Sequence, residues 1–249
     1  MKRKVNEMNT IDAALVLVDI SGYTRFVNFH SVSQVHAEEI ITQLLEAVID
    51  AAEFPLVLNK LEGDAVFLYT NASAGPHDRV AKDVLNQVNG LFSAFRAKQN
   101  ELIDGGRNGC PCDACENIDT LKLKAILHFG NVVVKQIRQF TELAGNEVIL
   151  IHRLLKNSVG MPEYMLITDA FLKLSSVPKG WAGQAVTEKY DDLAEVTGQA
   201  FPVQYGAPVA ERKATLMPRE VVGKVDRKLW WAQLPKRLFG KRAFKNLPG

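Results

Sequence analysis

Two hydrophobic periodicities alternate along the chain and predict its helices and strands. Continuous apolar runs bounded by turn residues are typical of buried strands, whereas apolar residues three and four apart are typical of amphipathic helices. The clearest strand is 13–20, where Asp19 is the one charged residue, and the clearest helix is 78–100. The predicted elements are, in chain order, strand 13–20, helix 33–54, strands 56–60 and 65–69, helix 78–100, strands 121–129 and 131–137, helix 146–157, strand 164–168, helix 169–175, and strands 184–193 and 200–205.

The order of these elements favours an α+β fold. Antiparallel strand pairs interleaved with helices predict one mainly antiparallel sheet with helices on one face. The tight turn at 62–64 predicts one hairpin, and we expect a second hairpin around Gly130. The folded domain is expected to span 1–210, followed by a tail at 211–249.

Composition supports a globular domain and sets the tail apart. The 249 residues are 47% hydrophobic and 23% charged, which is ordinary for a soluble protein with a real core. Segment 211–249 contains 11 Lys and Arg against 3 Asp and Glu, so its net charge is +8. Because the whole chain has a net charge of +2, residues 1–210 have a net charge of −6. The tail therefore differs in kind from the domain before it.

Targeting signals and cysteine usage favour a cytoplasmic protein. No apolar run approaches the roughly 18 residues of a membrane span, and the basic start of the chain lacks the pattern of a signal peptide. The 3 cysteines are an odd number and lie close together in sequence, which argues against a disulfide framework.

Two carboxylates predict a metal site at the ends of neighbouring strands. Asp19 ends the first strand and Asp64 lies in the hairpin turn, so both can offer oxygen ligands to divalent cations. Backbone N–H groups of Gly22, Tyr23 and Thr24, at the start of the next helical stretch, are candidates for binding phosphate. For each aspartate taken singly, an ordinary turn or cap role is the competing interpretation.

Four segments, in order, resemble the class III nucleotidyl cyclases, the family of adenylate and guanylate cyclases. The segments are VLVDISGYTRF, NKLEGDAVF, LKAILHFGNVVV and LAGNEVILIHRLLKNS. The resemblance covers about residues 13–205 and is strongest to a divergent, uncharacterised bacterial branch. It implies a ferredoxin-like, palm-type fold with a mainly antiparallel sheet.

The resemblance also implies a metal-dependent reaction. In that family, carboxylates at the positions of Asp19 and Asp64 bind two Mg²⁺ or Mn²⁺ ions, and Ile20 would add a backbone carbonyl. The 3′-hydroxyl of a nucleoside triphosphate attacks its own α-phosphate and releases pyrophosphate. A homodimer is implied, because each site combines metal ligands of one subunit with other groups of its partner.

Three further residues receive roles from the resemblance. Lys60 stands where adenylate cyclases place a purine-reading lysine, which favours ATP, and Glu142 falls near the second purine contact. Arg153 stands where the family places the arginine that stabilises the transition state. For Lys60 and Arg153 the alternative is an ordinary solvated side chain.

Departures from the family pattern keep a second function open. Ile149 occupies the position of a ribose-orienting Asn, and Thr197 falls where a triphosphate-binding Lys is expected. One hypothesis is therefore a divergent cyclase that converts ATP to a cyclic nucleotide. The other is a catalytically inactive regulator that binds nucleotide and metal with the same fold.

Three thiols lie within six residues at Cys110, Cys112 and Cys115. The C-x₂-C spacing of the last two matches half of a structural zinc site, for which Asp113, a distant histidine such as His77 or a partner chain could complete the ligands. A reversible disulfide and an incidental surface loop are the alternatives.

The tail interleaves basic and aromatic residues over 228–245. Such a segment can bind an anionic membrane surface, with Trp230 and Trp231 at the interface. This would place the protein peripherally at the inner face of the membrane. The competing interpretation is that the tryptophans pack on the domain itself. No nucleic-acid-binding module is recognisable, so we expect no nucleic-acid partner.

Overall fold

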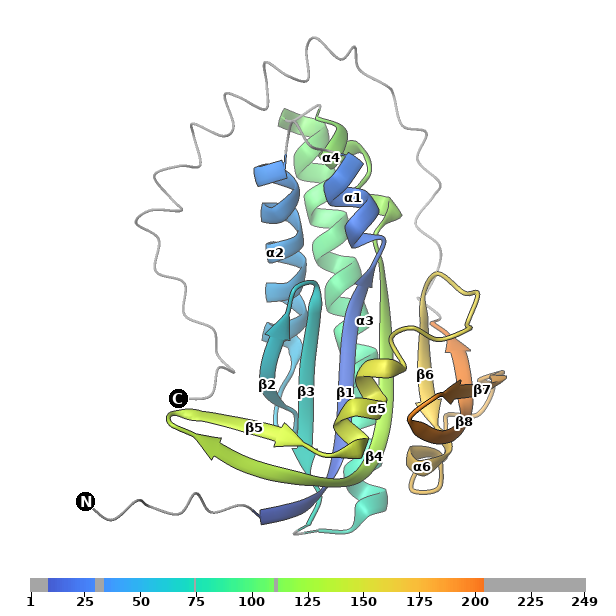
Figure 1. Ribbon diagram of the computed structural model, residues 1–249. Helices are drawn as coiled ribbons and strands as arrows, with labels where there is room; N and C mark the ends of the chain where they lie inside the picture. The colour runs from blue at the N-terminus through green and yellow to red at the C-terminus, as the bar shows by residue number, and fades with distance from the viewer. Residues whose placement is uncertain (1–8, 30–33, 74, 110–111, 204–249) are drawn as a thin grey trace, which may run out of the picture.

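The computed structural model describes residues 9–29, 34–73, 75–109 and 112–203 (Figure 1). The predictions for Cys110 and for the tail at 211–249 lie outside these ranges. The elements are β1 (Asn9–Ser21), α1 (Tyr23–Phe29), α2 (Gln34–Ala51), β2 (Val57–Glu62), β3 (Ala65–Asn71), α3 (His77–Gly109), α4 (Asp113–Glu116), a 3₁₀ turn (Ile118–Thr120), β4 (Lys122–Ile137), β5 (Phe140–Ala144), α5 (Asn146–Arg153), β6 (Tyr164–Thr168), α6 (Asp169–Leu172), β7 (Gln184–Tyr190) and β8 (Leu193–Pro202).

One sheet organises the described residues. Its strand order is β2-β3-β1-β4-β6-β8-β7, and β5 pairs with β4 outside this path. The β4–β6 pair is parallel, whereas β1 is antiparallel to both β3 and β4. The predicted α+β class with a mainly antiparallel sheet is confirmed.

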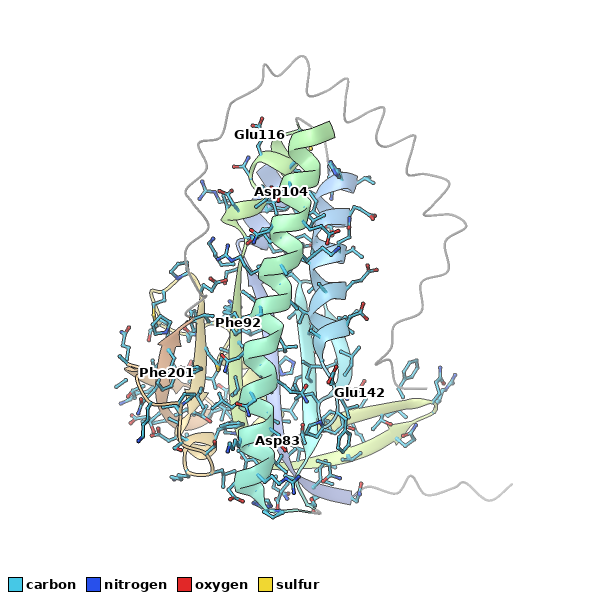
Figure 2. The ribbon with its side chains drawn as sticks, turned by 180° about the vertical axis from the view of Figure 1, so that it is seen from behind. Asp83, Phe92, Asp104, Glu116, Glu142 and Phe201 are labelled. Carbon is cyan, nitrogen blue, oxygen red and sulfur yellow. The ribbon has the colours of Figure 1, made fainter. Side chains whose placement is uncertain are left out.

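The central strand β1 separates two cores, which explains its unbroken apolar run. Alternate side chains of a strand point to opposite faces. Val16 and Val18 therefore join the core beneath α2 and α3, while Leu15 and Leu17 join the core beneath α5. Figure 2 shows α3 along the full length of the first face, with α2 beside it. The long helices thus share one face, as predicted, but α5, which the prediction placed with them, covers the other face, which we call the α5 face.

The predicted hairpin around Gly130 is wrong. The segments 121–129 and 131–137 form one continuous strand, β4, in which Gly130 pairs with Ala13 of β1. A Cβ atom at position 130 would lie 2.6 Å from Cγ of Glu147. The glycine therefore leaves room for the Glu147 side chain of α5 and forms no turn.

The hairpin turn falls later, between β4 and β5. Arg138 adopts a positive φ of 57° there, and the β4–β5 hairpin extends beyond the body of the sheet (Figure 1). Two of its residues, Ile137 and Phe140, keep 47% and 59% of their surface exposed. Apolar side chains on a projecting hairpin are available to contact another surface.

Helix and strand boundaries differ from the predicted ones where packing overrides local signals. Helix α3 continues to Gly109 instead of ending at Asn100, and β8 begins at Leu193 instead of Ala200. In β8, a Cβ at Gly198 would overlap the carbonyl oxygen of Ile167. The close pairing of β6 with β8 therefore needs a glycine that in sequence looks like a strand breaker.

No helix within the described ranges combines the length and the apolar character that crossing a bilayer requires.

Candidate metal and nucleotide site

Asp19 and Asp64 are brought together by the pairing of β1 with β3. Asp19 stands opposite Ala65 in the strand register. The backbone N–H of Ile20 donates to the carbonyl oxygen of Asp64 over 3.2 Å, and Gly63 gives the turn its positive φ of 65°. The Asp19 carboxylate of β1 and the Asp64 carboxylate of the β2–β3 turn are therefore neighbours, as the predicted metal site requires.

The electrostatics of this pair suit a divalent cation. Burial, reinforced by the nearby negative charge of Asp19, raises the pKa of Asp64 to about 6. Two carboxylates that repel each other in a half-buried position are stabilised by a bound cation. The side chains present therefore fit the Mg²⁺ or Mn²⁺ ligand set expected from the sequence.

A lysine that the sequence did not single out also faces Asp19. Lys124 of β4 lies opposite Asp19 in the register, and its Nζ is 2.9 Å from Oδ2 of Asp19. The same ammonium donates to the carbonyl oxygen of Leu155 over 3.3 Å. The two side chains of the ion pair are only 18% and 14% exposed, so the ammonium competes with a metal ion for the Asp19 oxygen.

The predicted phosphate-binding backbone directly follows Asp19 and Ile20. Gly22 has a positive φ of 93°, which glycine adopts readily, and α1 begins at Tyr23. The Tyr23 hydroxyl donates to Glu38 of α2 over 2.9 Å. Burial and the Glu38 carboxylate together raise the pKa of Tyr23. Gly22 and Thr24 are exposed, and phosphate binding by this turn stays a prediction.

Lys60 lies on the α5 face in a row of charges that links β2 to α5. Its Nζ is 2.8 Å from Oε1 of Glu62, and Oε2 of Glu62 is 2.9 Å from Nε2 of His152. Burial by itself would raise the pKa of Glu62, but Lys60 and His152 hold it below its ordinary value. This ion pair uses one of the three N–H donors of the Lys60 ammonium, and purine binding by Lys60 stays a prediction.

Arg153 is exposed and Glu142 is partly exposed, and no side-chain contact found among the described residues joins either of them to this row. The Arg153 guanidinium is 53% exposed and lies 3.3 Å from Asp192 in the turn between β7 and β8. Ile149, on the same helix, is 50% exposed. Glu142 lies on β5, on the opposite side of the molecule from Phe201 of β8 (Figure 2). Among the described residues of a single chain, neither Arg153 nor Glu142 is found in contact with Asp19 or Asp64.

Three of the residues described above were not assigned a site role from sequence, although each carries a charge or an imidazole. They are Lys124 on β4, Glu62, which the sequence analysis placed only in the hairpin turn at 62–64, and His152 on α5. Only the tertiary structure shows that Lys124 contacts Asp19 and that Glu62 contacts both Lys60 and His152. A charged residue within an apolar strand, such as Lys124 in LKLKAIL, is the one signal that could have found them.

Cys112 and Cys115 contact a histidine that the sequence did not link to them, His36 of α2. The distant His77 begins α3, whereas Cys112 follows the end of that 33-residue helix. At 1.5 Å per residue the helix is about 50 Å long, so His77 cannot complete a site with these cysteines in the same chain. It packs instead on Phe129, with 5.0 Å between ring centroids.

Solved structures with this fold are nucleotidyl cyclases and a related binding protein. The adenylyl cyclase CyaB from Pseudomonas aeruginosa aligns with a TM-score of 0.54 at 13% identity, over 84% of this chain and 99% of that chain. The guanylyl cyclase domain of the RhoGC fusion protein from Blastocladiella emersonii gives 0.52 at 16%, over 80% and 99%. A class III adenylyl cyclase-like ATP-binding protein from Pseudomonas aeruginosa gives 0.53 at 18%, over 68% and 36%. The fold is therefore that of the class III cyclase domains.

Sequence relatives define the family more narrowly. A family model described as "Protein of unknown function (DUF2652)" matches residues 41–164. The uncharacterized protein Rv2561/Rv2562 of Mycobacterium tuberculosis is 37% identical over 157 residues, which are 63% of this chain and 70% of that protein. The chain belongs to the family of this mycobacterial protein.

Proposed function

We propose that the protein is a divergent class III nucleotidyl cyclase that converts a nucleoside triphosphate, with ATP favoured, to a 3′,5′-cyclic nucleotide and pyrophosphate. The observation that carries the proposal is the proximity of Asp19 on β1 to the half-buried Asp64 in the adjoining β2–β3 turn. Holding two like charges together in a half-buried place destabilises the folded protein. A protein can retain this loss of stability at a functional site, where a bound cation neutralises the two carboxylates.

The residues of this chain divide the work of binding and positioning. Asp19, Asp64 and the carbonyl of Ile20 would hold two Mg²⁺ or Mn²⁺ ions, which when bound supply charge neutralisation and activation of the attacking hydroxyl. Backbone N–H groups at 22–24 would orient the phosphates. Lys60 would donate to the purine through an N–H that its ion pair with Glu62 leaves available.

The remaining groups point to a homodimer, in which one chain completes the site of the other. Arg153 and Glu142 make no contact with Asp19 or Asp64 that is found in the described chain, yet both belong to the proposed site. Exposed Ile137 and Phe140 on the projecting β4–β5 hairpin provide apolar surface for a partner chain. A guanidinium from the partner would then counter the charge that develops on the phosphate.

A second candidate function is favoured by the Lys124 contact. An ammonium 2.9 Å from Asp19 supplies a positive charge that a metal would otherwise supply. Ile149 also places an exposed apolar side chain where a ribose contact is expected. Under this alternative the dimer binds nucleotide without turnover and acts as a regulator.

The deciding experiment is incubation of the purified full chain with each nucleoside triphosphate and Mn²⁺, followed by mass spectrometry. A cyclic product that disappears in both Asp19→Ala and Asp64→Ala, while the variants stay folded and dimeric, supports the cyclase. Metal-dependent nucleotide binding without product, measured by calorimetry, supports the regulator. Failure to bind any nucleotide rules out both.

For the tail we propose association with an anionic membrane surface, at the inner face of the cytoplasmic membrane. The support is its net charge of +8 and its paired tryptophans, Trp230 and Trp231. We expect the full chain to sediment with anionic vesicles at low salt and much less with neutral ones. Replacing both tryptophans by serine should release it, and equal binding to both kinds of vesicle would contradict the proposal.

A further inference from the structure

Three metal-ligating side chains converge where the start of α2 meets α4 and the end of α3. His36 lies in the first turn of α2, Cys112 directly precedes α4, and Cys115 lies within α4. One ligand atom from each residue lies within 4.8 Å of the other two. In Figure 2, Glu116 of α4 and Asp104 of α3 mark this end of the molecule, and Asp83 marks the opposite end of α3.

The three side chains are close enough to enter one zinc coordination shell after a small adjustment. With Zn–S and Zn–N bonds of about 2.3 and 2.05 Å, ligand atoms of a tetrahedral site lie about 3.6 to 3.8 Å apart. Nδ1 of His36 is 3.1 Å from Sγ of Cys112, and its Nε2 is 3.8 Å from Sγ of Cys115. Rotation of the imidazole so that one nitrogen faces both sulfurs is the adjustment that the site needs.

The surroundings favour a thiolate site over exposed reactive thiols. Cys112 is 0% exposed and belongs to the core cluster with Ala37 and Ala114. The backbone N–H of Cys115 donates to Sγ of Cys112 over 3.4 Å, which favours the thiolate. Two thiolates, a neutral imidazole and Zn²⁺ sum to zero charge, so metal binding lets both sulfurs ionise without leaving a buried net charge.

The presence of His36 beside the two cysteines favours a metal site over a reversible disulfide. A reversible disulfide needs two cysteines and no further ligand, and no disulfide joins Cys112 to Cys115. His36 comes from a helix 76 residues earlier in the chain, and tertiary packing sets its imidazole against both sulfurs.

We propose that His36, Cys112 and Cys115 bind a structural zinc ion that ties the start of α2 to α4. These residues fill three of the four positions of tetrahedral zinc. The bound ion would fix α2, whose Glu38 accepts the Tyr23 hydroxyl beside the carboxylate site. The proposal does not depend on nucleotide turnover, because its measurements concern metal content and stability.

The first test is the zinc content of the full chain purified under reducing conditions without chelator, measured by elemental analysis. We expect about one zinc per chain in the wild type. His36→Ala and Cys115→Ser, both at partly exposed positions, should each lose most of this zinc, because removing a direct ligand should weaken binding by more than the roughly tenfold seen for outer-shell partners. His77→Ala is the matched control and should keep its zinc.

The second test uses the wild type and needs no variant to fold. Removing zinc with a chelator should lower the thermal midpoint, and returning Zn²⁺ should restore it. Chelation should also expose Cys115 to alkylation, detected by mass spectrometry. Replacing zinc by Co²⁺ should give thiolate-to-cobalt charge-transfer absorption that His36→Ala loses.

Three results would each overturn the proposal. They are a wild type without zinc that gains no stability from added Zn²⁺, a Cys112–Cys115 disulfide in the purified protein, and full zinc content in His36→Ala. If the zinc results hold while no cyclic nucleotide forms, the proposed function fails and the zinc site stands.

Discussion

Asp64 illustrates at the residue scale how a binding group can oppose stability. Its carboxylate is half-buried beside the charge of Asp19, and its pKa of about 6 reflects both causes. Lys124 offsets the charge of Asp19 by direct contact, but it lies only near Asp64. The unbound site therefore holds more negative charge than the fold by itself would favour.

Asp64→Asn should stabilise the metal-free protein at pH 7 and above, because it removes one of two repelling charges without changing the side-chain shape. The thermal midpoint without metal is expected to rise, whereas the increase caused by Mn²⁺ in the wild type should disappear. Differential scanning fluorimetry with and without Mn²⁺ measures both effects. Asp191→Asn, at an exposed turn position, is the matched control and should change neither. A lower midpoint for metal-free Asp64→Asn would contradict the role given to charge repulsion.

Glu147, in contrast to Asp64, is a carboxylate whose ionised form stabilises the fold. A hydrogen bond from Nε2 of the His128 ring, 2.6 Å from its Oε2, lowers the pKa of Glu147 despite partial burial. The other ring nitrogen of His128 lies 2.9 Å from the Thr168 hydroxyl. Because the folded-state pKa lies below the unfolded value, this carboxylate stabilises the fold above the unfolded pKa and loses that effect as pH falls through the folded pKa.

Glu147→Gln should therefore flatten the acid limb of the stability profile. At pH 7 the variant is expected to lose about 1 kcal/mol of unfolding free energy, since the amide can still accept the bond from His128. The difference from wild type should shrink as pH falls below about 4.5, the ordinary Glu value. Urea unfolding between pH 3 and 7 gives the comparison. Glu101→Gln, which alters an exposed ion pair on α3, should stay within about 0.5 kcal/mol of wild type throughout.

At the scale of elements, the glycines within helices and strands differ in whether packing leaves room for a larger side chain. Gly90 lies at an exposed position of α3, where an added Cβ atom would meet no neighbour within 4 Å, whereas Gly198 lies in β8 against the backbone of β6. Gly90 therefore has no steric reason to be glycine, whereas at Gly198 a larger side chain would collide with the neighbouring strand. Gly130 resembles Gly198 in this respect: it lies within a continuous strand, and an added Cβ atom would meet the Glu147 side chain.

Substituting these two glycines by alanine should change stability in opposite directions. Gly90→Ala is expected to add up to about 1 kcal/mol to the unfolding free energy, through helix propensity. Gly198→Ala should remove about 1 to 3 kcal/mol, because the new methyl group forces β6 and β8 apart. Denaturant titrations followed by circular dichroism measure both. Equal effects of the two changes would mean that the β6–β8 contact is looser than described.

At the scale of the whole molecule, the proposed site requires two chains. Asp19 and Asp64 lie where β1 and the β2–β3 turn meet, while Arg153 ends α5 and pairs with Asp192. Sharing of residues across a two-fold axis is a common way in which identical chains complete a site.

Mixing two inactive variants tests this sharing directly. Asp64→Ala and Arg153→Ala chains, combined in equal amounts and allowed to exchange, should recover about a quarter of the wild-type rate. Half of the dimers are then mixed, and each mixed dimer keeps one intact site of two. Each variant assayed separately should be inactive, and the readout is cyclic product by mass spectrometry. An inactive mixture in which exchange is demonstrated would contradict a shared site.

The sequence by itself determined the fold class, most of the longer helices and strands, and the position of Asp19 and Asp64 at strand ends. These features are local: the apolar run at 13–20, the turn at 62–64 and the amphipathic helices carry their signals in neighbouring residues. Position along the chain was also enough to place Asp19 and Asp64 at the ends of strands.

Only the tertiary structure decided which distant side chains meet. It placed Lys124 on Asp19, His152 on Glu62 and His36 on the two cysteines, because strand register and helix packing bring together residues that sequence spacing does not relate. It also corrected Gly130 from a turn residue to a packing residue, since a glycine needed for close approach and one needed for a turn look alike in sequence.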